Sequence, residues 1–321
     1  MLRWGVIGPG GIAGEFAEAN ALVEGSEIVA VVSRSLERAN RYAEAHGIPN
    51  RYDRVADLCA DPNVDAIYVA TPHSSHEQDA LAALRAGKHV LCEKPLALNA
   101  RQSTAMVDEA RTRGLFLMEA IWSRFLPAYR ALVDVLGEGE IGEPLLVEGE
   151  FGFRGPTDPA HRLYDPALGG GSLLDLGIYP LQLCTLVLGI PERVAASGVI
   201  GDTGVDELVA ATLTHRAGLG IIKSATRASL TCTARITGTD GRIDIPAFMH
   251  CPDALTVVSP TGTRTIDAPF QHGLHFEIEE AQRCIAAGQV ESPVMPLDES
   301  VALAGIMDTI RSQIGVTYPG E

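Results

Sequence analysis

The sequence predicts an α/β protein with two domains, a doubly wound parallel sheet followed by an α+β domain with a large, mostly antiparallel open sheet. Short apolar runs alternate with helical patterns over the first 120 residues. Strand-like segments then follow one another without helices between them. The chain has 321 residues, which is long for a single hydrophobic core. We therefore predict domains at residues 1–120 and 121–321.

The predicted strands of the first domain are short apolar runs that end at turn residues. They are Leu2–Ile7, Glu27–Val32, Asp65–Ala70, Lys88–Cys92 and Leu115–Met118. Helical patterns lie between most of them, at Ile12–Val23, Leu36–His46, Ser75–Ala86 and Asn99–Arg113. Gly47, Gly87 and Gly114 follow three of these helices, where glycine commonly ends a helix. Continuous apolar strands that alternate with helices are typical of a parallel sheet covered on both faces.

The second domain is predicted because the regular alternation of strand and helix patterns stops after Phe125. Its first expected elements are a helix at Ala128–Leu136, a strand at Leu145–Phe153, and a helix that follows Gly169-Gly170-Gly171 and runs to Leu188. Segments such as Leu208–Thr214 and Gly220–Thr226 then follow, separated only by turn signals, so neighbouring strands are expected to be antiparallel. The last two expected helices are Leu274–Ala287 and Leu297–Gln313.

Composition argues against several classes of partner. The net charge of −16 opposes binding to nucleic acid or anionic lipid. We find neither a signal-type N-terminus nor an apolar run near the roughly 18 residues that a membrane span needs. The six cysteines form no CxxC pair and none stands at zinc spacing from a histidine. We therefore expect a cytoplasmic protein with free thiols, no metal site, and no membrane or nucleic acid partner.

The first strand ends in a glycine-rich loop, Gly8-Pro9-Gly10-Gly11-Ile12-Ala13, with the pattern G-x-G-x-x-A. Gly8 permits a tight turn, Gly10 lets a pyrophosphate approach the backbone, and the small third position lets strand and helix pack closely. Backbone N–H groups at Gly11 and Ile12 would open the helix and face the phosphates. The alternative is a glycine-rich turn without a ligand. Its position at the first strand–helix junction favours a dinucleotide-binding Rossmann domain.

The end of the second strand indicates which dinucleotide binds. NAD enzymes usually place Asp or Glu there to accept from the ribose 2′-hydroxyl. This strand ends in Val32-Ser33-Arg34-Ser35, without a carboxylate, and Arg38 lies one helical turn further on. Ser33, Arg34 and Arg38 are suited to hold a 2′-phosphate. We therefore predict NADP; the alternative is that Arg34 is a solvated surface residue.

Two segments contain candidate catalytic residues. Glu93, Lys94 and Pro95 follow a strand whose carboxyl end should face the ligand crevice, and Pro95 could form a cis peptide. In a helix, Asp175 and Tyr179 would share one face at i and i+4. A nearby ammonium would favour the phenolate of Tyr179, which could then serve as an acid or base. The alternatives are a solvated lysine and a buried tyrosine bonded to a structural aspartate.

Together these motifs resemble the Gfo/Idh/MocA oxidoreductase family along the whole chain. The resemblance lies in Gly8-x-Gly10-x-x-Ala13, Glu93-Lys94-Pro95 and Gly169-Gly-Gly-x-Leu-x-Asp175-x-Gly177-x-Tyr179. Many members have His where this chain has Tyr179, and Asp where it has Gln182. Tyr179, the segment Gly114–Pro127 and the segment Glu291–Leu297 are similar to the branch of dimeric dihydrodiol dehydrogenases and NADP-dependent aldose (xylose) dehydrogenases.

The resemblance implies functions for individual residues. It makes Lys94 and Tyr179 the catalytic pair, at the place where the domains meet, with Asp175 orienting the pair or binding substrate. It places Trp122 and Arg124 along the cofactor and active site, and Thr71, Pro72, His73 and His76 near the dinucleotide. Trp122 could equally belong to the core, and the two histidines could be surface residues. The resemblance also implies a homodimer formed through the C-terminal sheet.

The predicted reaction is hydride transfer between nicotinamide C4 and an alcohol carbon of a sugar, such as the aldose xylose, or of a trans-dihydrodiol. Which of Lys94 and Tyr179 accepts the proton is left open, as are the substrate and the physiological direction. One alternative is a sugar–sugar oxidoreductase that keeps NADP bound. Another is a regulator that senses the dinucleotide without catalysis, against which the intact pair Lys94 and Tyr179 argues.

Overall fold

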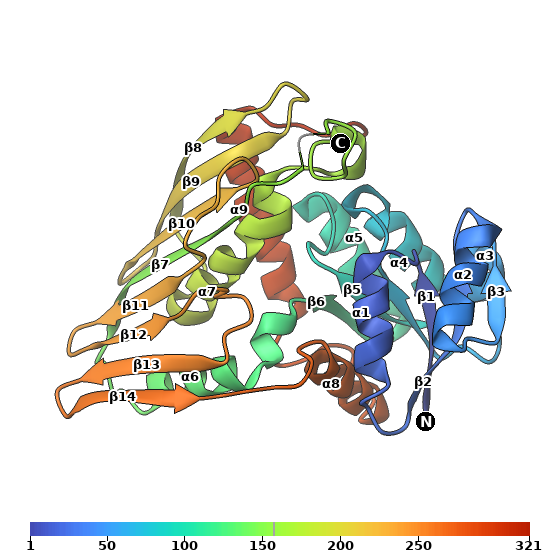
Figure 1. The fold of residues 1–321 in the computed structure, drawn as a ribbon, viewed down its shortest axis with the longest axis horizontal. Coiled ribbons are helices and arrows are strands. Elements are labelled where there is room, and N and C mark those ends of the chain that lie inside the picture. Colours follow the sequence, from blue (N-terminus) through green and yellow to red (C-terminus); the bar gives the residue numbers. More distant parts are fainter. Residues whose placement is uncertain (157) are drawn as a thin grey trace. The chain divides into compact units, whose positions relative to one another are not determined.

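The computed structural model describes residues 1–156 and 158–321, which form two compact units (Figure 1). The first unit contains Met1–Trp122 and His272–Val301, and the second contains Ser123–Gln271 and Ala302–Glu321. Residues 272–301, which the sequence predicts as part of the second domain, thus pack with the first unit. The functional division of the chain at residue 120 stays a prediction.

The first unit is built on a six-stranded parallel sheet with the order β3-β2-β1-β4-β5-β6 (Figure 1). The strands are β1 (Leu2–Ile7), β2 (Ser26–Val32), β3 (Asn50–Tyr52), β4 (Ala66–Val69), β5 (His89–Glu93) and β6 (Leu117–Ala120). The helices are α1 (Gly11–Asn20), α2 (Leu36–His46), α3 (Val55–Cys59), α4 (His76–Arg85), α5 (Ala100–Arg113) and α8 (His275–Ala286). The strand order reverses between β1 and β4, which is where open α/β sheets bind ligands. The predicted doubly wound sheet is confirmed.

Apolar side chains cover both faces of this sheet. On one face, Phe16 of α1 stacks on Tyr68 of β4 with ring centroids 3.8 Å apart, and Trp4 meets Phe16 edge-on at 5.5 Å. On the other, Leu84 of α4 and Met106 of α5 belong to a fully buried cluster with strand residues. Burial on both faces explains why the strands are continuous apolar runs rather than alternating ones.

The ends of two helices follow directly from their sequences. Ser35 caps α2 by accepting a hydrogen bond from the Arg38 backbone N–H, and Asn99 caps α5 by accepting one from Gln102. Gly47 and Gly114 end the same helices with φ of 69° and 64°, in the left-handed region that favours glycine. The caps hold the turns that precede them, and the turn before α2 belongs to the predicted NADP site.

The second unit contains an eight-stranded sheet with the order β14-β13-β12-β11-β7-β10-β9-β8. Its strands are β7 (Pro144–Gly152), β8 (Arg193–Ile200), β9 (Asp206–Thr214), β10 (Leu219–Ala225), β11 (Ala234–Gly238), β12 (Arg242–Ile245), β13 (Ala254–Ser259) and β14 (Gly262–Asp267). Among the described strands of this second sheet, only the pair β7 and β10 is parallel. The predicted large, mostly antiparallel sheet is therefore confirmed.

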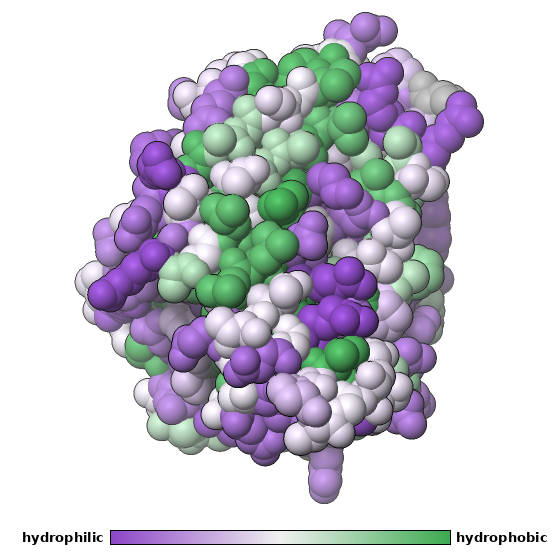
Figure 2. All heavy atoms as spheres, turned by 90° about the vertical axis from the view of Figure 1, so that its left-hand side faces the viewer, coloured by the Kyte–Doolittle hydropathy of each residue, from purple (hydrophilic) through white to green (hydrophobic). Residues whose placement is uncertain are grey.

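Helices cover one face of this sheet and leave the other open (Figure 1). The covering helices are α6 (Pro127–Gly137), α7 (Ile178–Leu188) and the later part of α9 (Leu297–Ile314), whose first turn belongs to the first unit. Along β9, Val209, Ala211 and Leu213 are buried, whereas Ala210 and Thr212 between them are exposed. Figure 2 shows the open face, with apolar side chains gathered along its middle.

The stretch Pro166–Leu188, which includes α7, is long and apolar enough to cross a membrane by length and composition. However, 83% of the tested window is buried inside the structure. A core helix of a globular domain has the same composition, because it is surrounded by other apolar elements. The helix is therefore accounted for by its place under the eight-stranded sheet.

Candidate active site

The glycine loop after β1 has the geometry of a phosphate site. Gly8 has a φ of +89°, and a Cβ there would lie 2.8 Å from the Ala70 carbonyl oxygen, so only glycine fits. Gly10 stands at the N-cap of α1, and Gly11 begins the helix. A Cβ at either position would meet no atom within 4 Å among the described residues, so space is open above the loop. The N-terminus of α1 thus faces an open cradle that fits a dinucleotide pyrophosphate.

The turn after β2 presents the residues predicted to select NADP. Arg34 and Arg38 are exposed, whereas Ser33 and Ser35 are half-buried. The Ser33 hydroxyl accepts a hydrogen bond from the Ser35 backbone N–H at 3.3 Å, which fixes the turn. Two guanidinium groups are therefore available at the carboxyl end of a strand next to β1. A role in binding phosphate stays a prediction.

The turn after β4 contains Thr71, Pro72, His73 and His76. His76 is fully buried, and its two ring nitrogens lie 2.9 Å from the Pro95 carbonyl oxygen and 2.8 Å from that of Thr71. Burial lowers the pKa of His76, while the two carbonyl oxygens act in the opposite direction. The imidazole ties the turn after β4 to the turn after β5. We therefore assign it a supporting position, and its predicted proximity to the dinucleotide stays untested.

Lys94 follows β5 directly, and the neighbouring backbone is held from several sides. The Lys94–Pro95 peptide is cis, as the sequence suggests. Glu93 accepts a hydrogen bond from the buried Tyr68 hydroxyl at 2.5 Å and one from the Lys94 backbone N–H at 3.3 Å. The Leu96 N–H donates to the buried carboxylate of Glu119 at 2.8 Å. Lys94 itself is half-buried, so a rigid turn presents its ammonium at the carboxyl edge of the sheet.

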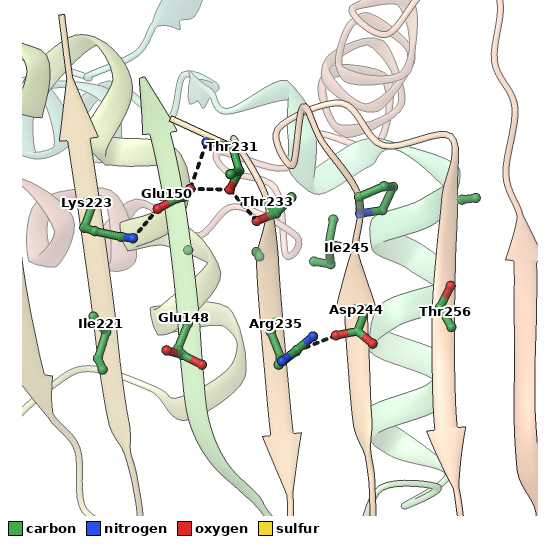
Figure 3. Close-up of a pocket in the computed structure, with 14 residues that line it drawn as sticks. Glu148, Glu150, Ile221, Lys223, Thr231, Thr233, Arg235, Asp244, Ile245 and Thr256 are labelled. Atoms are coloured by element: carbon green, nitrogen blue, oxygen red, sulfur yellow. Dashed lines mark hydrogen bonds and ion pairs between the residues drawn. The ribbon is translucent and has the colours of Figure 1, made fainter. Parts of the chain in front are cut away.

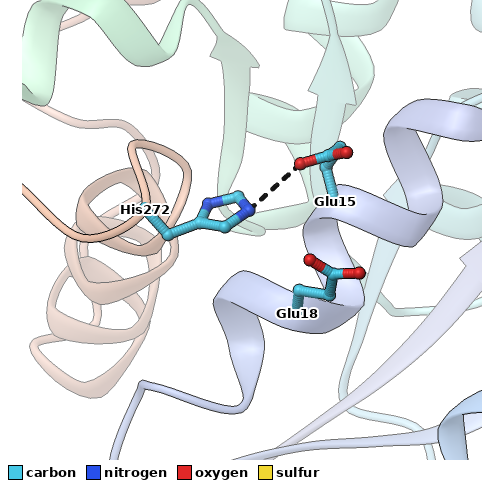
Figure 4. Close-up of side chains that lie close together, drawn as sticks. All are labelled: Glu15, Glu18 and His272. Atoms are coloured by element: carbon cyan, nitrogen blue, oxygen red, sulfur yellow. Dashed lines mark hydrogen bonds and ion pairs between the residues drawn. The ribbon is translucent and has the colours of Figure 1, made fainter.

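Trp122 lies after β6 at the same edge and packs on the loop that precedes α8. A Cβ on Gly273 would lie 2.0 Å from the indole, so the ring lies directly against this glycine. The adjacent His272 pairs with Glu15 of α1 at 3.2 Å, and Glu18 lies close by (Figure 4). Glu15 and Glu18 are exposed, and we assign no metal to this cluster. The loop 271–273 is thus held between Trp122 and α1.

In the second unit, the glycine run leads into the helix that contains Asp175 and Tyr179. Leu173–Gly177 form a π-helix, and α7 follows from Ile178. The predicted α-helical i, i+4 relation of Asp175 and Tyr179 is therefore wrong in detail, because the wider turn changes the angle between their side chains. Both side chains are buried. Single π-helical turns inside helices occur frequently at functional sites.

Asp175 is held by an arginine that the sequence does not single out. Arg162 donates from its two terminal nitrogens to the two carboxylate oxygens, at 3.1 and 3.2 Å. Asp175 is only 7% exposed in its side chain, whereas Arg162 is 54% exposed. Bidentate pairing fixes the plane of the carboxylate as well as its position. Asp175 is thus oriented by Arg162, a contact that helical spacing alone does not reveal.

Tyr179 lies in a small aromatic cluster within the second unit. Its ring centroid is 5.5 Å from that of Phe151 on β7 and 5.2 Å from that of His250. Phe151 and His250 stack on each other at 4.3 Å with an interplanar angle of 16°. The Ser123 hydroxyl donates to the His250 carbonyl oxygen at 2.5 Å and fixes the loop. The ring of Tyr179 therefore has two flat neighbours, an apolar phenyl ring and an imidazole.

Arg124 is buried below α7, and its contacts reveal a structural function. Its guanidinium donates to the Gln182 side-chain oxygen at 2.5 Å and to the Gln182 carbonyl oxygen at 2.9 Å. Gln182 lies one turn after Tyr179 on the same helix. Arg124 thus anchors the helix of Tyr179. Its predicted place beside the cofactor stays untested.

The structure gathers the predicted cofactor residues of the first unit at one edge. The glycine loop, the turn after β2, the Thr71–His76 turn, Lys94 and Trp122 all follow strands of one parallel sheet. Asp175, Tyr179 and Arg124 belong to the second unit. Arg162, Phe151, His250 and Tyr68 were not predicted. Of these four residues, only Tyr68 could have been found from the sequence. It lies inside the apolar run Ala66–Val69, and a buried tyrosine hydroxyl needs a hydrogen-bond partner.

The fold and these sites define an oxidoreductase with a dinucleotide-binding domain, and comparison with known families agrees. The family described as "Oxidoreductase family, NAD-binding Rossmann fold" matches residues 2–121, and "GFO/IDH/MocA C-terminal domain" matches residues 129–244. The chain therefore belongs to the Gfo/Idh/MocA oxidoreductases, which confirms the resemblance seen in the sequence.

Individual relatives cover the whole chain. It is 39% identical over 333 residues to the trans-1,2-dihydrobenzene-1,2-diol dehydrogenase of Bos taurus, covering 100% of this chain and 99% of the relative. The 3-ketoreductase KijD10 of Actinomadura kijaniata, solved with NADP and TDP-benzene, superposes with a TM-score of 0.88 at 28% identity and 98% coverage of each chain. The aldose-aldose oxidoreductase of Caulobacter crescentus, solved with glycerol, gives a TM-score of 0.88 at 26% identity and 97% coverage of each chain.

Proposed function

We propose that this protein is an NADP-dependent dehydrogenase that transfers a hydride between nicotinamide C4 and an alcohol carbon, with Lys94 and Tyr179 as its acid–base pair. The proposal rests on one observation, that the phosphate cradle and Lys94 lie at the same carboxyl edge of the first sheet. An open phosphate cradle at Gly10 and Gly11 and a rigidly presented Lys94 follow strands of the same parallel sheet. A solved relative with NADP and the curated dihydrodiol dehydrogenases support it.

The residues of the chain supply binding and proton transfer. When bound, the nicotinamide supplies the hydride chemistry. Tyr179 takes the hydroxyl proton of the substrate during oxidation and returns it during reduction. The ammonium of Lys94 stabilises the negative charge that develops on oxygen. Asp175, fixed by Arg162, orients the pair or binds a substrate hydroxyl.

The substrate class follows from the surroundings of Tyr179. Phe151 and His250 offer flat ring faces next to the phenol, and such faces suit the apolar face of a sugar ring or a cyclic diol. We therefore propose a cyclic polyol, either an aldose or a trans-dihydrodiol. The relatives named above act on both kinds of molecule according to their names.

NADP preference is proposed from Arg34 and Arg38. Replacing Arg34 with alanine should weaken NADP binding by about 1.5–3 kcal/mol, because one charge-assisted interaction with the 2′-phosphate is lost. NAD binding should hardly change, since NAD lacks that phosphate. Titration of both dinucleotides checks this, with Arg41→Ala as the control. Arg41 is an exposed arginine of α2, and its guanidinium pairs with Glu37. If the unmodified protein bound NAD as tightly as NADP, or more tightly, the preference for NADP would be wrong.

We also propose a homodimer formed through the open face of the eight-stranded sheet. The face has a groove of about 740 Å³ lined by residues of β7, β10, β11, β12 and β13 (Figure 3). Two ion pairs lie in this groove, Lys223 with Glu150 and Arg235 with Asp244, whereas Glu148, which also lines it, has no ion-pair partner among the described residues. A second copy can cover the paired charges and apolar residues without isolating an ion, provided that it offers Glu148 a partner.

A single charge on this face should separate the subunits. Thr212 on β9 is exposed there, between Ala195 on β8 and Ile221 on β10. Thr212→Arg would bury an unpaired cation in the interface, so its light-scattering mass should fall to that of a monomer. The control Thr104→Arg, on the exposed side of α5, should stay dimeric. A monomeric mass for the unmodified protein at micromolar concentration would contradict the proposal.

We further propose a reducing, cytoplasmic location, which the six free thiols support.

The function itself is tested by steady formation of NADPH from NADP on a panel of aldoses and trans-dihydrodiols. The proposal expects turnover on at least one class. Dinucleotide binding without turnover on any member would favour the regulator. Turnover only with two sugars present, and without released NADPH, would favour the sugar–sugar oxidoreductase.

A further inference from the structure

The first unit buries a carboxylic acid that the proposed reaction does not use. Glu277 on α8 has 0% exposed surface. Neither of its carboxylate oxygens has a hydrogen-bond partner among the residues that the structure describes. An ionised carboxylate that is buried without donors is very costly, whereas a neutral acid is much less so. Burial of Glu277 at this position therefore favours the neutral acid over the carboxylate.

The neighbours of Glu277 are acidic. It interacts electrostatically with Glu93 at the end of β5 and with Tyr68 on β4. Charged groups on the helices beside it are Glu15 and Glu18 on α1, which are exposed, and Glu279, Glu280 and Arg283 on α8 itself. Arg283 is bound to Glu280. Among the described residues, the one charged group that acts on the pKa of Glu277 is thus Glu93, which is also an acid.

Both carboxyl groups are buried and interact electrostatically, so they cannot both be ionised without repulsion. Glu93 has donors for a negative charge, the Tyr68 hydroxyl at 2.5 Å and the Lys94 backbone N–H at 3.3 Å. Glu277 has none among the described residues. The single charge is therefore more stable on Glu93, and the proton on Glu277. Burial, with the charge of Glu93, also raises the pKa of Glu277 well above its ordinary value.

We propose that Glu277 is a positioning residue that stays protonated in the folded protein and keeps the one negative charge of this acidic pair on Glu93, beside Lys94. This inference rests on the proposed function, since it takes Glu93 and Lys94 as part of the dinucleotide site. A second charge at Glu277 would push the Glu93 carboxylate away from its donors, and the backbone of Lys94 would move with it. The neutral acid thereby preserves the turn that presents Lys94.

The proposal predicts a distinctive pH dependence. Above the ordinary glutamate value of 4.5, the unfolded chain releases this proton and the folded protein retains it. The folded state then binds more protons, so its stability falls as the pH rises, until the raised folded pKa is reached. Glu277→Gln cannot titrate. The ratio of the unfolding constant of the unmodified protein to that of Glu277→Gln should therefore rise by up to about tenfold per pH unit in this window.

Glu280, one turn along α8, provides a control of opposite sign. Burial opposes its ionisation, but hydrogen bonds from Arg283 and Ser292 hold its pKa below the ordinary value. Its charge therefore stabilises the fold, and this contribution is lost as the pH falls through the folded pKa. The corresponding ratio for Glu280→Gln should fall, not rise, with increasing pH. Reversible urea unfolding across a pH series measures both variants.

Dinucleotide titration separates positioning from mere packing. Glu277→Gln keeps a neutral side chain with a hydrogen-bond donor and should bind NADP within a few-fold of the unmodified protein. Glu277→Met is also uncharged and should likewise bind NADP within a few-fold, and neither variant should show the loss of NADP affinity that the unmodified protein shows once the pH rises far enough to ionise Glu277. A flat ratio of unfolding constants for Glu277→Gln would overturn the proposal, as would an NADP affinity of the unmodified protein that follows the same pH course as that of both variants. If the unmodified protein bound neither NADP nor NAD, the proposed function would fail instead, while the unfolding data would still report the protonation of Glu277.

Discussion

Replacement of Tyr179 by phenylalanine is expected to lower turnover by about 10²–10⁴-fold, the usual loss when a general acid or base is removed. The change deletes only the hydroxyl and keeps the ring that packs against Phe151 and His250. Folding and NADP affinity should therefore change little. Steady-state kinetics with a substrate from the panel measure the loss, and titration with NADP verifies that the binding site is intact.

A matched control is available in the same unit. Tyr129 is equally buried, and its hydroxyl donates to the Met249 carbonyl oxygen at 2.9 Å. The hydroxyl also accepts a hydrogen bond from the Gln182 side-chain amide at 3.3 Å, so Tyr129→Phe should cost about 1–3 kcal/mol of stability, the net value of two hydrogen bonds, and leave turnover within a few-fold. If both variants lost turnover equally, the effect at Tyr179 would be one of packing rather than proton transfer.

The second large effect is expected at Lys94. Lys94→Ala should reduce turnover by several orders of magnitude, because the charge that develops on the substrate oxygen loses its cation. In the reduction direction, the limb on which activity falls with rising pH should move to higher pH, since a phenol without a nearby ammonium holds its proton more tightly. Combined with Tyr179→Phe, the losses should not add, because the two residues act as a unit.

Lys88 provides the control for this variant. It lies at the other end of β5, where its ammonium donates to the carbonyl oxygens of Asp61 and Val64 at 2.8 and 2.7 Å. Lys88→Ala should reduce stability without affecting turnover. If Tyr179→Phe kept turnover within a few-fold while Lys94→Ala was inactive, Lys94 itself would be the base, and the function assigned to Tyr179 would be wrong.

The fold was largely predictable because its signals are local. Apolar runs buried on both faces, Ser35 and Asn99 at helix starts, and Gly47 and Gly114 at helix ends each act within a few residues. The short elements β3 and α3 were not predicted, since they are too brief to show a period. The association of residues 272–301 with the first unit depends on packing with residues far away in sequence, and no local pattern encodes it.

The candidate site was likewise predictable where its signals are local and not where it depends on contacts between distant residues. Motifs that are continuous in sequence, such as the glycine loop and Glu93-Lys94-Pro95, were predicted residue by residue. Contacts between distant residues were not, including Arg162 with Asp175, Arg124 with Gln182, and Tyr68 with Glu93. The π-helix at Leu173–Gly177 was also missed, because its composition is that of an ordinary buried helix. The burial of Glu277 without a hydrogen-bond partner among the described residues could not be foreseen either, since it depends on packing between distant residues.

The most direct test of the central claim follows a single hydrogen. A substrate from the panel is prepared with deuterium on its reacting carbinol carbon and incubated with the protein and NADP. The account predicts that the deuterium is found at C4 of the nicotinamide in the NADPH formed, as detected by NMR, with none lost to solvent. Oxidised product with deuterium released to water, or with NADPH that carries no deuterium, would contradict hydride transfer and with it the proposed function.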